Sequence, residues 1–189
     1  MLKRTEYVGG NSIQLLQSVG KLFPVILPGN VATLYNRANK ALERNEYKTA
    51  LNLLDRALVC TGKPEPNILI NKGLALKNLG KLKEAIECYD AAIQADPENH
   101  FSFIPWNNKG VVFGIMSKHD EAKMFFEEAL RVNPHYKIAL LNKGIALKQM
   151  GLNDEANKCF DKYFENDLLT LTEHNIKVAR IKRQEVALH

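Results

Sequence analysis

The stretch NKGVVFGIMSKHDEAKMFFEEALRVNP, residues 108–134, decides the fold because the chain contains three similar copies of it. Earlier in the chain, NKGLALKNLGKLKEAIECYDAAIQADP occupies residues 71–97, and later NKGIALKQMGLNDEANKCFDKYFE occupies residues 142–165. The first two copies start 37 residues apart and the last two start 34 residues apart. A period of this length is typical of arrays of helical repeats.

Each copy predicts two helices joined by a short turn. In the middle copy, Pro105 suits a first helical turn, where its missing N–H is no loss. Trp106, Gly110 and Phe113 then follow at the spacing of one helix face. After the turn SKHD, a second apolar face runs through Ala122, Phe126 and Ala129.

The sizes of these residues predict how the two helices pack. Gly110 and Ala122 are expected where the helices cross, because small residues let the backbones approach closely. Trp106, Phe113 and Phe126 are expected to fill the space beside them. A single hairpin of this kind cannot bury both of its faces, so neighbouring hairpins must stack on it.

These residues resemble the tetratricopeptide repeat, whose pattern is W-x2-L-G-x2-Y followed by A-x3-F, A and P. The matching positions are Gly73, Ala85, Tyr89, Ala92, Pro97, Trp106, Gly110, Phe113, Ala122, Phe126, Ala129, Pro134, Gly144, Ala156 and Phe160. The last copy departs from the pattern late, with Tyr163 for the small residue and Leu168 for the proline. The resemblance implies an all-α, right-handed superhelical array of about four helical hairpins.

The resemblance also divides the chain into units. They are a degenerate first repeat at 31–64, then repeats at 66–99, 103–136 and 137–170. A capping box runs from Thr170 to Glu173, and residues 171–189 are expected to form a C-terminal cap helix, which terminal repeats need for solubility. Residues 1–30 contain an apolar stretch, 11–27, that is expected to be helical in part. That stretch either caps the first repeat or covers the groove until a partner displaces it.

Composition and charge narrow the class of protein. With 46% hydrophobic residues and no apolar run long enough to span a bilayer, the sequence predicts a cytoplasmic protein without a membrane segment. Cys60, Cys88 and Cys159 lie far apart and are odd in number, which predicts free thiols. The net charge of +5 is concentrated at the two ends, since residues 31–170 hold nineteen bases and eighteen acids. Nucleic acid is therefore not an expected partner of the middle of the chain.

The chain shows no motif of a catalytic or metal centre. None of its five histidines lies four residues from another, and no nucleophile elbow, phosphate-binding loop or dinucleotide fingerprint occurs. The recurring glycines appear once per repeat, which indicates packing. We expect a protein that is not an enzyme and that uses neither a metal nor a cofactor.

The resemblance implies that the first helix of each unit lines a concave face, with positions 2, 5, 6, 9 and 13 pointing inward. The sixth position is asparagine in every unit: Asn36, Asn71, Asn108 and Asn142. Asparagine is a mediocre helix former, so its recurrence needs a reason. An amide both donates and accepts hydrogen bonds. The column is expected either to bind the backbone of an extended peptide, as in O-linked N-acetylglucosamine transferases, or to bond to the adjacent helix and fix the register.

The other inward positions are largely apolar. They are Tyr35, Asn39, Ile70, Leu74, Ile104, Val111, Ile115, Ile138, Leu141 and Ile145. Chaperone-binding tetratricopeptide domains have cations where this chain has Tyr35, Ile104 and Asn108. The acidic C-terminus of a chaperone is therefore not an expected partner.

An apolar groove lined with amides predicts a non-covalent task. We expect an adaptor or scaffold that holds an apolar segment of a protein or peptide partner, helical or extended, in its concave face. One alternative is a substrate-recruiting or regulatory subunit of a larger enzyme system, for example a glycosyltransferase acting in trans. Another is RNA binding through the basic ends. Association of two copies through the ends is also left open.

Overall fold

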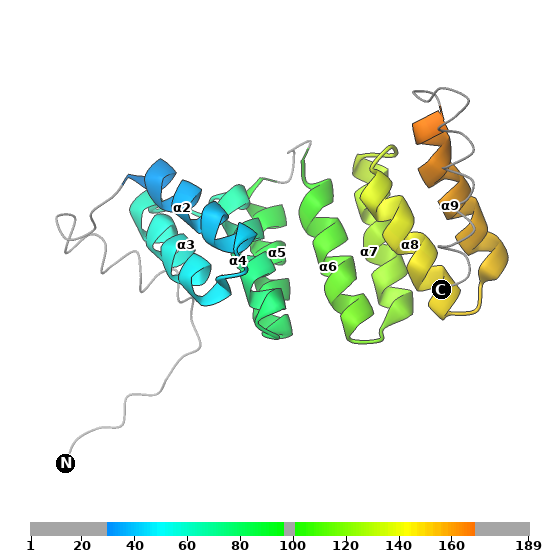
Figure 1. Cartoon of the computed structure of the whole chain (residues 1–189), viewed down its shortest axis with the longest axis horizontal. Coiled ribbons are helices and arrows are strands. Elements are labelled where there is room, and N and C mark those ends of the chain that lie inside the picture. The colour runs from blue at the N-terminus through cyan, green and yellow to red at the C-terminus, as the bar shows by residue number, and fades with distance from the viewer. Residues whose placement is uncertain (1–29, 97–100, 169–189) are drawn as a thin grey trace, which may run out of the picture.

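The computed structural model describes residues 30–96 and 101–168, which form eight α-helices and contain no strand (Figure 1). The helices are α2 (Val31–Glu43), α3 (Tyr47–Thr61), α4 (Pro66–Asn78), α5 (Leu82–Ala95), α6 (Phe103–Ile115), α7 (His119–Val132), α8 (Lys137–Gln149) and α9 (Asn153–Leu168). The expected all-α superhelical architecture is confirmed. The expected N-terminal segment, the expected C-terminal cap helix and Pro97 lie outside the described residues.

The helices pack as four hairpins that follow one another in chain order along the length of the molecule (Figure 1). Each first helix packs on its own second helix, and each second helix packs on the first helix of the next hairpin. The first helices α2, α4, α6 and α8 also contact one another in that order. They form one continuous surface, the concave face, which positions the candidate site. In the described part of the chain, no helix has the length and apolar character needed to cross a membrane.

Each hairpin turn places one residue in the left-handed backbone region, at the same position of its unit. The four residues are Asn45, Gly80, Ser117 and Gly151, with φ between 59° and 77°. Glycine adopts this conformation without steric cost, and asparagine tolerates it better than most residues. Ser117 is therefore the least suited of the four to its position.

Three hairpins are closed by a glycine of the first helix that lies against an aromatic ring of the second. The pairs are Gly73 with Tyr89, Gly110 with Phe126 and Gly144 with Phe160. A Cβ atom on Gly73 would lie 2.5 Å from a carbon of the Tyr89 ring, a distance that real side chains do not show. The partner of each of these three glycines is thus an aromatic ring. Ala122 is fully buried beside the Phe126 ring.

The first hairpin makes the same contact with a different pair of residues. Ala38 replaces the glycine and Leu54 replaces the ring, and both are fully buried. Leucine is shorter than tyrosine or phenylalanine, so it leaves room for the methyl group of Ala38. This exchange explains how a unit that is degenerate in sequence forms the same hairpin.

Aromatic rings fill the outer seam between the second and third hairpins. The Phe125 ring centroid lies 6.0 Å from that of Trp106 and 4.8 Å from that of Phe113. The ammonium group of Lys109 lies 4.5 Å above the centre of the Phe125 ring and 2.6 Å from the carboxylate of Asp90 on α5. The cluster therefore bridges α5, α6 and α7.

A lysine at one recurring position joins each hairpin to the one before it. The ion pairs are Lys72–Asp55 at 2.6 Å, Lys109–Asp90 at 2.6 Å and Lys143–Glu127 at 2.8 Å. The three lysine side chains are only 14–25% exposed, so their stems pack against the preceding hairpin. Because the pairs are partly buried, salt screens them less than it screens exposed pairs.

Candidate functional site

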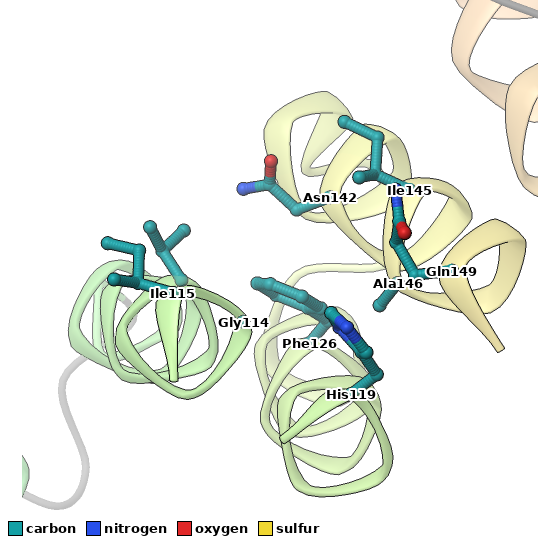
Figure 2. Close-up of a pocket in the computed structure, with 9 residues that line it drawn as sticks. Gly114, Ile115, His119, Phe126, Asn142, Ile145, Ala146 and Gln149 are labelled. Carbon is teal, nitrogen blue, oxygen red and sulfur yellow. The ribbon is translucent and has the colours of Figure 1, made fainter. Parts of the chain in front are cut away.

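An open pocket of about 330 Å³ lies on the concave face between α6, α7 and α8 (Figure 2). Its lining consists of Val111, Gly114, Ile115, His119, Phe126, Asn142, Ile145, Ala146 and Gln149. Figure 2 shows Ile115 of α6 and Ile145 of α8 on separate helices, with the ring of Phe126 between them. Four residues expected in the groove therefore come together here: Val111, Ile115, Asn142 and Ile145.

The apolar side chains at and near this pocket are unusually accessible to solvent. Ile115 is 56% exposed and Ile145 is 45% exposed, and Ile138, about two turns before Ile145 on α8, is 52% exposed. Covering a large aliphatic side chain completely is worth roughly 1.5–3 kcal/mol. A group of such residues on one face is the usual mark of an interaction surface.

Two asparagines of the sixth-position column form hydrogen bonds to the preceding first helix. Nδ2 of Asn71 donates to Oδ1 of Asn39 at 2.7 Å and to the hydroxyl of Tyr35 at 3.2 Å. Nδ2 of Asn142 donates to Oδ1 of Asn107 at 2.9 Å. These bonds link adjacent hairpins. Within the described residues, the Oδ1 atoms of Asn71 and Asn142 accept no hydrogen bond, so each retains an acceptor for a ligand.

Asn107 belongs to this network of hydrogen bonds, although it was not among the groove residues predicted from the sequence. It is only 2% exposed, and its Nδ2 lies 3.4 Å from Oδ1 of Asn108. Asn107 stands at the fifth position of its unit, one residue before the column. The signal was present, because the fifth position was among those expected to point inward and a second amide there is conspicuous.

The remaining expected groove residues lie elsewhere along the first helices. They are Asn36, Ile70, Leu74, Ile104, Asn108 and Ile138. Leu141 is half-buried and packs on the core of the fourth hairpin beside Leu147 and Phe160, so it contributes less surface to the groove than expected.

Two polar residues at the edge of the pocket, His119 and Gln149, were not among the groove residues named from the sequence. His119 is the first residue of α7 and Gln149 is the last residue of α8 (Figure 2). Gln149 occupies the thirteenth position of its unit, which the repeat pattern places on the inner side. His119 lies on a second helix, and nothing in the pattern indicates that it reaches the groove.

The pocket offers apolar surface and amides rather than paired acids and bases. Among the nine lining residues, His119 is the only one with an ionisable side chain. Burial raises the pKa of the Cys88 thiol to about 11 and raises the pKa of the Tyr89 hydroxyl, but neither residue lines the pocket. Across the described ranges, no group of three or more His, Cys, Asp or Glu side chains is placed to hold a metal ion.

Comparison with known proteins identifies the repeat. Two profiles described as tetratricopeptide repeat match the chain, over residues 66–99 and 105–136. Human tetratricopeptide repeat protein 13 is 28% identical over 139 residues, which is 70% of this chain and 16% of that protein. A barley protein, the probable UDP-N-acetylglucosamine–peptide N-acetylglucosaminyltransferase SPINDLY, is 35% identical over 98 residues, or 50% of this chain and 10% of that protein. The chain thus spans less than a quarter of the length of these curated relatives.

A solved structure shows the same fold. MamA from Desulfovibrio magneticus RS-1, from residue 41 to its end, superposes with a TM-score of 0.62 at 22% sequence identity. The match covers 84% of this chain and 94% of that one. The similarity therefore extends over most of the array of hairpins.

Proposed function

Because this chain is a tetratricopeptide repeat protein with an open apolar pocket on its concave face, we propose that it is a non-catalytic adaptor that binds an apolar segment of a partner protein there. The observation that carries the proposal is the accessible apolar surface of Ile115 and Ile145 on the two first helices that flank the pocket.

The size of the pocket favours a segment rather than a folded surface. At about 330 Å³ it is at the small end of ligand pockets, so it suits one large apolar side chain. Asn142 lines this pocket, and its Oδ1 atom can accept a hydrogen bond from a backbone N–H group of the partner. An apolar side chain in the pocket and a backbone hydrogen bond beside it would fix the segment in one register.

The polarity of the concave face differs between its two ends. Around the first two hairpins it carries the network of Tyr35, Asn39 and Asn71, which is polar. Around the last two hairpins it carries the exposed isoleucines. We therefore expect the apolar residue of the partner over α6 and α8, and a more polar part of the same segment over α2 and α4.

The proposal includes the cytoplasm as the compartment. Its support is the state of the three cysteines, Cys60, Cys88 and Cys159, all of which are free thiols. Free thiols are usual where the environment is reducing.

The test is a quantitative pull-down from native extract with three proteins. They are the wild type, Ile115→Glu/Ile145→Glu, and the control Met124→Glu, which alters a side chain that is 62% exposed on α7 and outside the pocket. All three sites are exposed, so the variants should fold, as circular dichroism can check. We expect partners captured by the wild type and the control to be lost with the double variant. Equal capture by all three proteins would refute the groove as the binding site.

A further inference from the structure

A second pocket, of about 520 Å³, opens between α7, α8 and α9. Its lining consists of Leu130, Leu140, Lys143, Leu147, Glu155, Lys158, Cys159 and Lys162. Asn142 lines the concave pocket and Lys143 lines this one, and successive residues of a helix point roughly 100° apart. The two pockets therefore use different sides of α8. We call the second one the seam pocket.

The seam pocket lies where the fourth hairpin has smaller residues than the third. In the preceding seam, Trp106, Phe113 and Phe125 pack together. The residues 34 positions later are Leu140, Leu147 and Cys159, which are all smaller. The chain thus fills one seam with its own rings, whereas a pocket remains at the next one beside the buried Leu140 and Leu147.

The rim of the seam pocket is basic. Lys158 and Lys162 lie one turn apart on α9, both are exposed, and neither has an ion-pair partner within the described ranges. Lys143 is already paired with Glu127, and Glu155 is the one acid in the lining. The equivalent positions of the other hairpins hold Asn52 and Arg56, Glu87 and Ala91, and Met124 and Glu128. The lysine pair is therefore particular to the hairpin whose seam is open.

We propose that the seam pocket binds an acidic peptide segment of a partner protein that carries one large apolar side chain. The apolar side chain enters the seam pocket beside Cys159, at the position that Phe125 holds in the preceding seam, and lies against Leu130 and the edge of Leu140. Carboxylates on either side of it pair with Lys158 and Lys162. Residues 171–189 of the same chain hold four bases and two acids, so charge favours an acidic partner over this segment.

The lining of the seam pocket favours a peptide over a nucleic acid. A nucleic acid strand is also anionic, but single strands bind where bases stack on aromatic rings, and no aromatic residue lines the seam pocket.

The proposed peptide site is separate from the proposed binding site on the concave face, because Ile115 and Ile145 do not line the seam pocket. The two proposals can therefore fail separately.

The test uses the full chain and the fluorescein-labelled peptide Glu-Glu-Leu-Phe-Glu-Glu, with binding followed by fluorescence anisotropy at low salt. We expect saturable binding that weakens at least tenfold when lysine replaces each glutamate of the probe or serine replaces its leucine and phenylalanine. The variant Lys158→Glu/Lys162→Glu should also weaken binding at least tenfold. The control Lys48→Glu/Lys83→Glu changes the net charge equally at two exposed lysines outside the pocket, and it should bind as the wild type does.

A second variant tests the pocket itself. Leu140→Trp/Cys159→Phe copies Trp106 and Phe125 of the third hairpin, so it should fill the seam pocket and abolish binding while the protein stays folded by circular dichroism. If this variant misfolds, the lysine pair and its control decide the question.

Three results would overturn the proposal. The first is the absence of saturable binding by the wild type. The second is equal binding by the wild type and Lys158→Glu/Lys162→Glu. The third is tighter binding of a twelve-residue oligouridylate that competes with the peptide, which would assign the lysines to nucleic acid instead.

Discussion

Gly110 of α6 lies so close to Phe126 of α7 that a Cβ atom on the glycine would be 2.6 Å from Cε1 of the ring. Gly73 and Tyr89 stand in the same relationship in the second hairpin, and Gly144 and Phe160 do so in the fourth. The contact sets how near the two helices of a hairpin come to each other. An added methyl group at this contact should therefore change the stability of the protein more than one added elsewhere in the hairpin.

Gly110→Ala is expected to lower the free energy of unfolding by about 1–3 kcal/mol, because overpacking outweighs the higher helix propensity of alanine. Urea unfolding followed by circular dichroism measures it. The control is Gly114→Ala in the same helix, where an added Cβ has nothing within 4 Å. That change should raise stability by about 0.5–1 kcal/mol. Equal effects of the two substitutions would show that helix propensity alone is at work.

The first hairpin suggests a compensating change. Gly110→Ala/Phe126→Leu copies the pair Ala38 and Leu54, which is fully buried in the first hairpin. The double variant should be more stable than the sum of the two single effects implies, by about 1 kcal/mol or more. Strict additivity in a double-mutant cycle would contradict the steric explanation.

Tyr89→Phe is expected to raise the free energy of unfolding by about 1 kcal/mol. The Tyr89 hydroxyl oxygen is buried and has no hydrogen-bond partner among the described residues, and such a group costs about 1–3 kcal/mol. Phe126 and Phe160 already occupy the equivalent positions. Loss of stability in Tyr89→Phe at pH 7 would show that the hydroxyl is satisfied after all.

The same substitution should change the response to alkali. Burial raises the pKa of Tyr89 in the folded protein above its value in the unfolded chain, about 10. As the pH rises past that value, the hydroxyl ionises in the unfolded chain but stays protonated in the folded protein, so the free energy of unfolding falls. Tyr89→Phe should therefore lose less stability than the wild type between pH 9 and 11, the range of the measurement. The neighbouring Cys88, which is present in both proteins, adds to the raised pKa of Tyr89.

Ser117→Gly is expected to raise the free energy of unfolding by about 1 kcal/mol, because Ser117 has a φ of 59° and glycine adopts this conformation without steric cost. The reciprocal change Gly151→Ser, at a φ of 77° in the fourth hairpin, should lower stability by a similar amount. Thermal unfolding of both variants beside the wild type checks the pair. Shifts of the same sign would exclude the backbone explanation.

The Lys109–Asp90 ion pair is expected to couple the second and third hairpins by about 1 kcal/mol. The Lys109 side chain is 14% exposed and Asp90 is 40% exposed, so solvent screens the pair only in part. A double-mutant cycle with Lys109→Met and Asp90→Ala measures the coupling. The reference is the pair Lys81 and Glu84, with exposures of 50% and 53%, which should give about 0.5 kcal/mol or less. Equal couplings would mean that burial adds nothing.

The sequence by itself determined the hairpins. Their contacts are local, and a helix face repeats every three or four residues, so Trp106, Gly110 and Phe113 reveal one helix and Ala122, Phe126 and Ala129 reveal the other. The period of the copies then required stacking, because one hairpin cannot bury both of its faces.

Only the tertiary structure decided what happens between hairpins. Contacts there join residues about 35 positions apart, such as Asn142 with Asn107, and they depend on the rotation from one unit to the next, which no local pattern encodes. The exchange of Phe125 for Cys159 appears in the sequence as two apolar residues in register. Whether that exchange leaves a packed seam or an open one depends on all the side chains that three helices bring to the same place, and so it is settled only when the helices are packed.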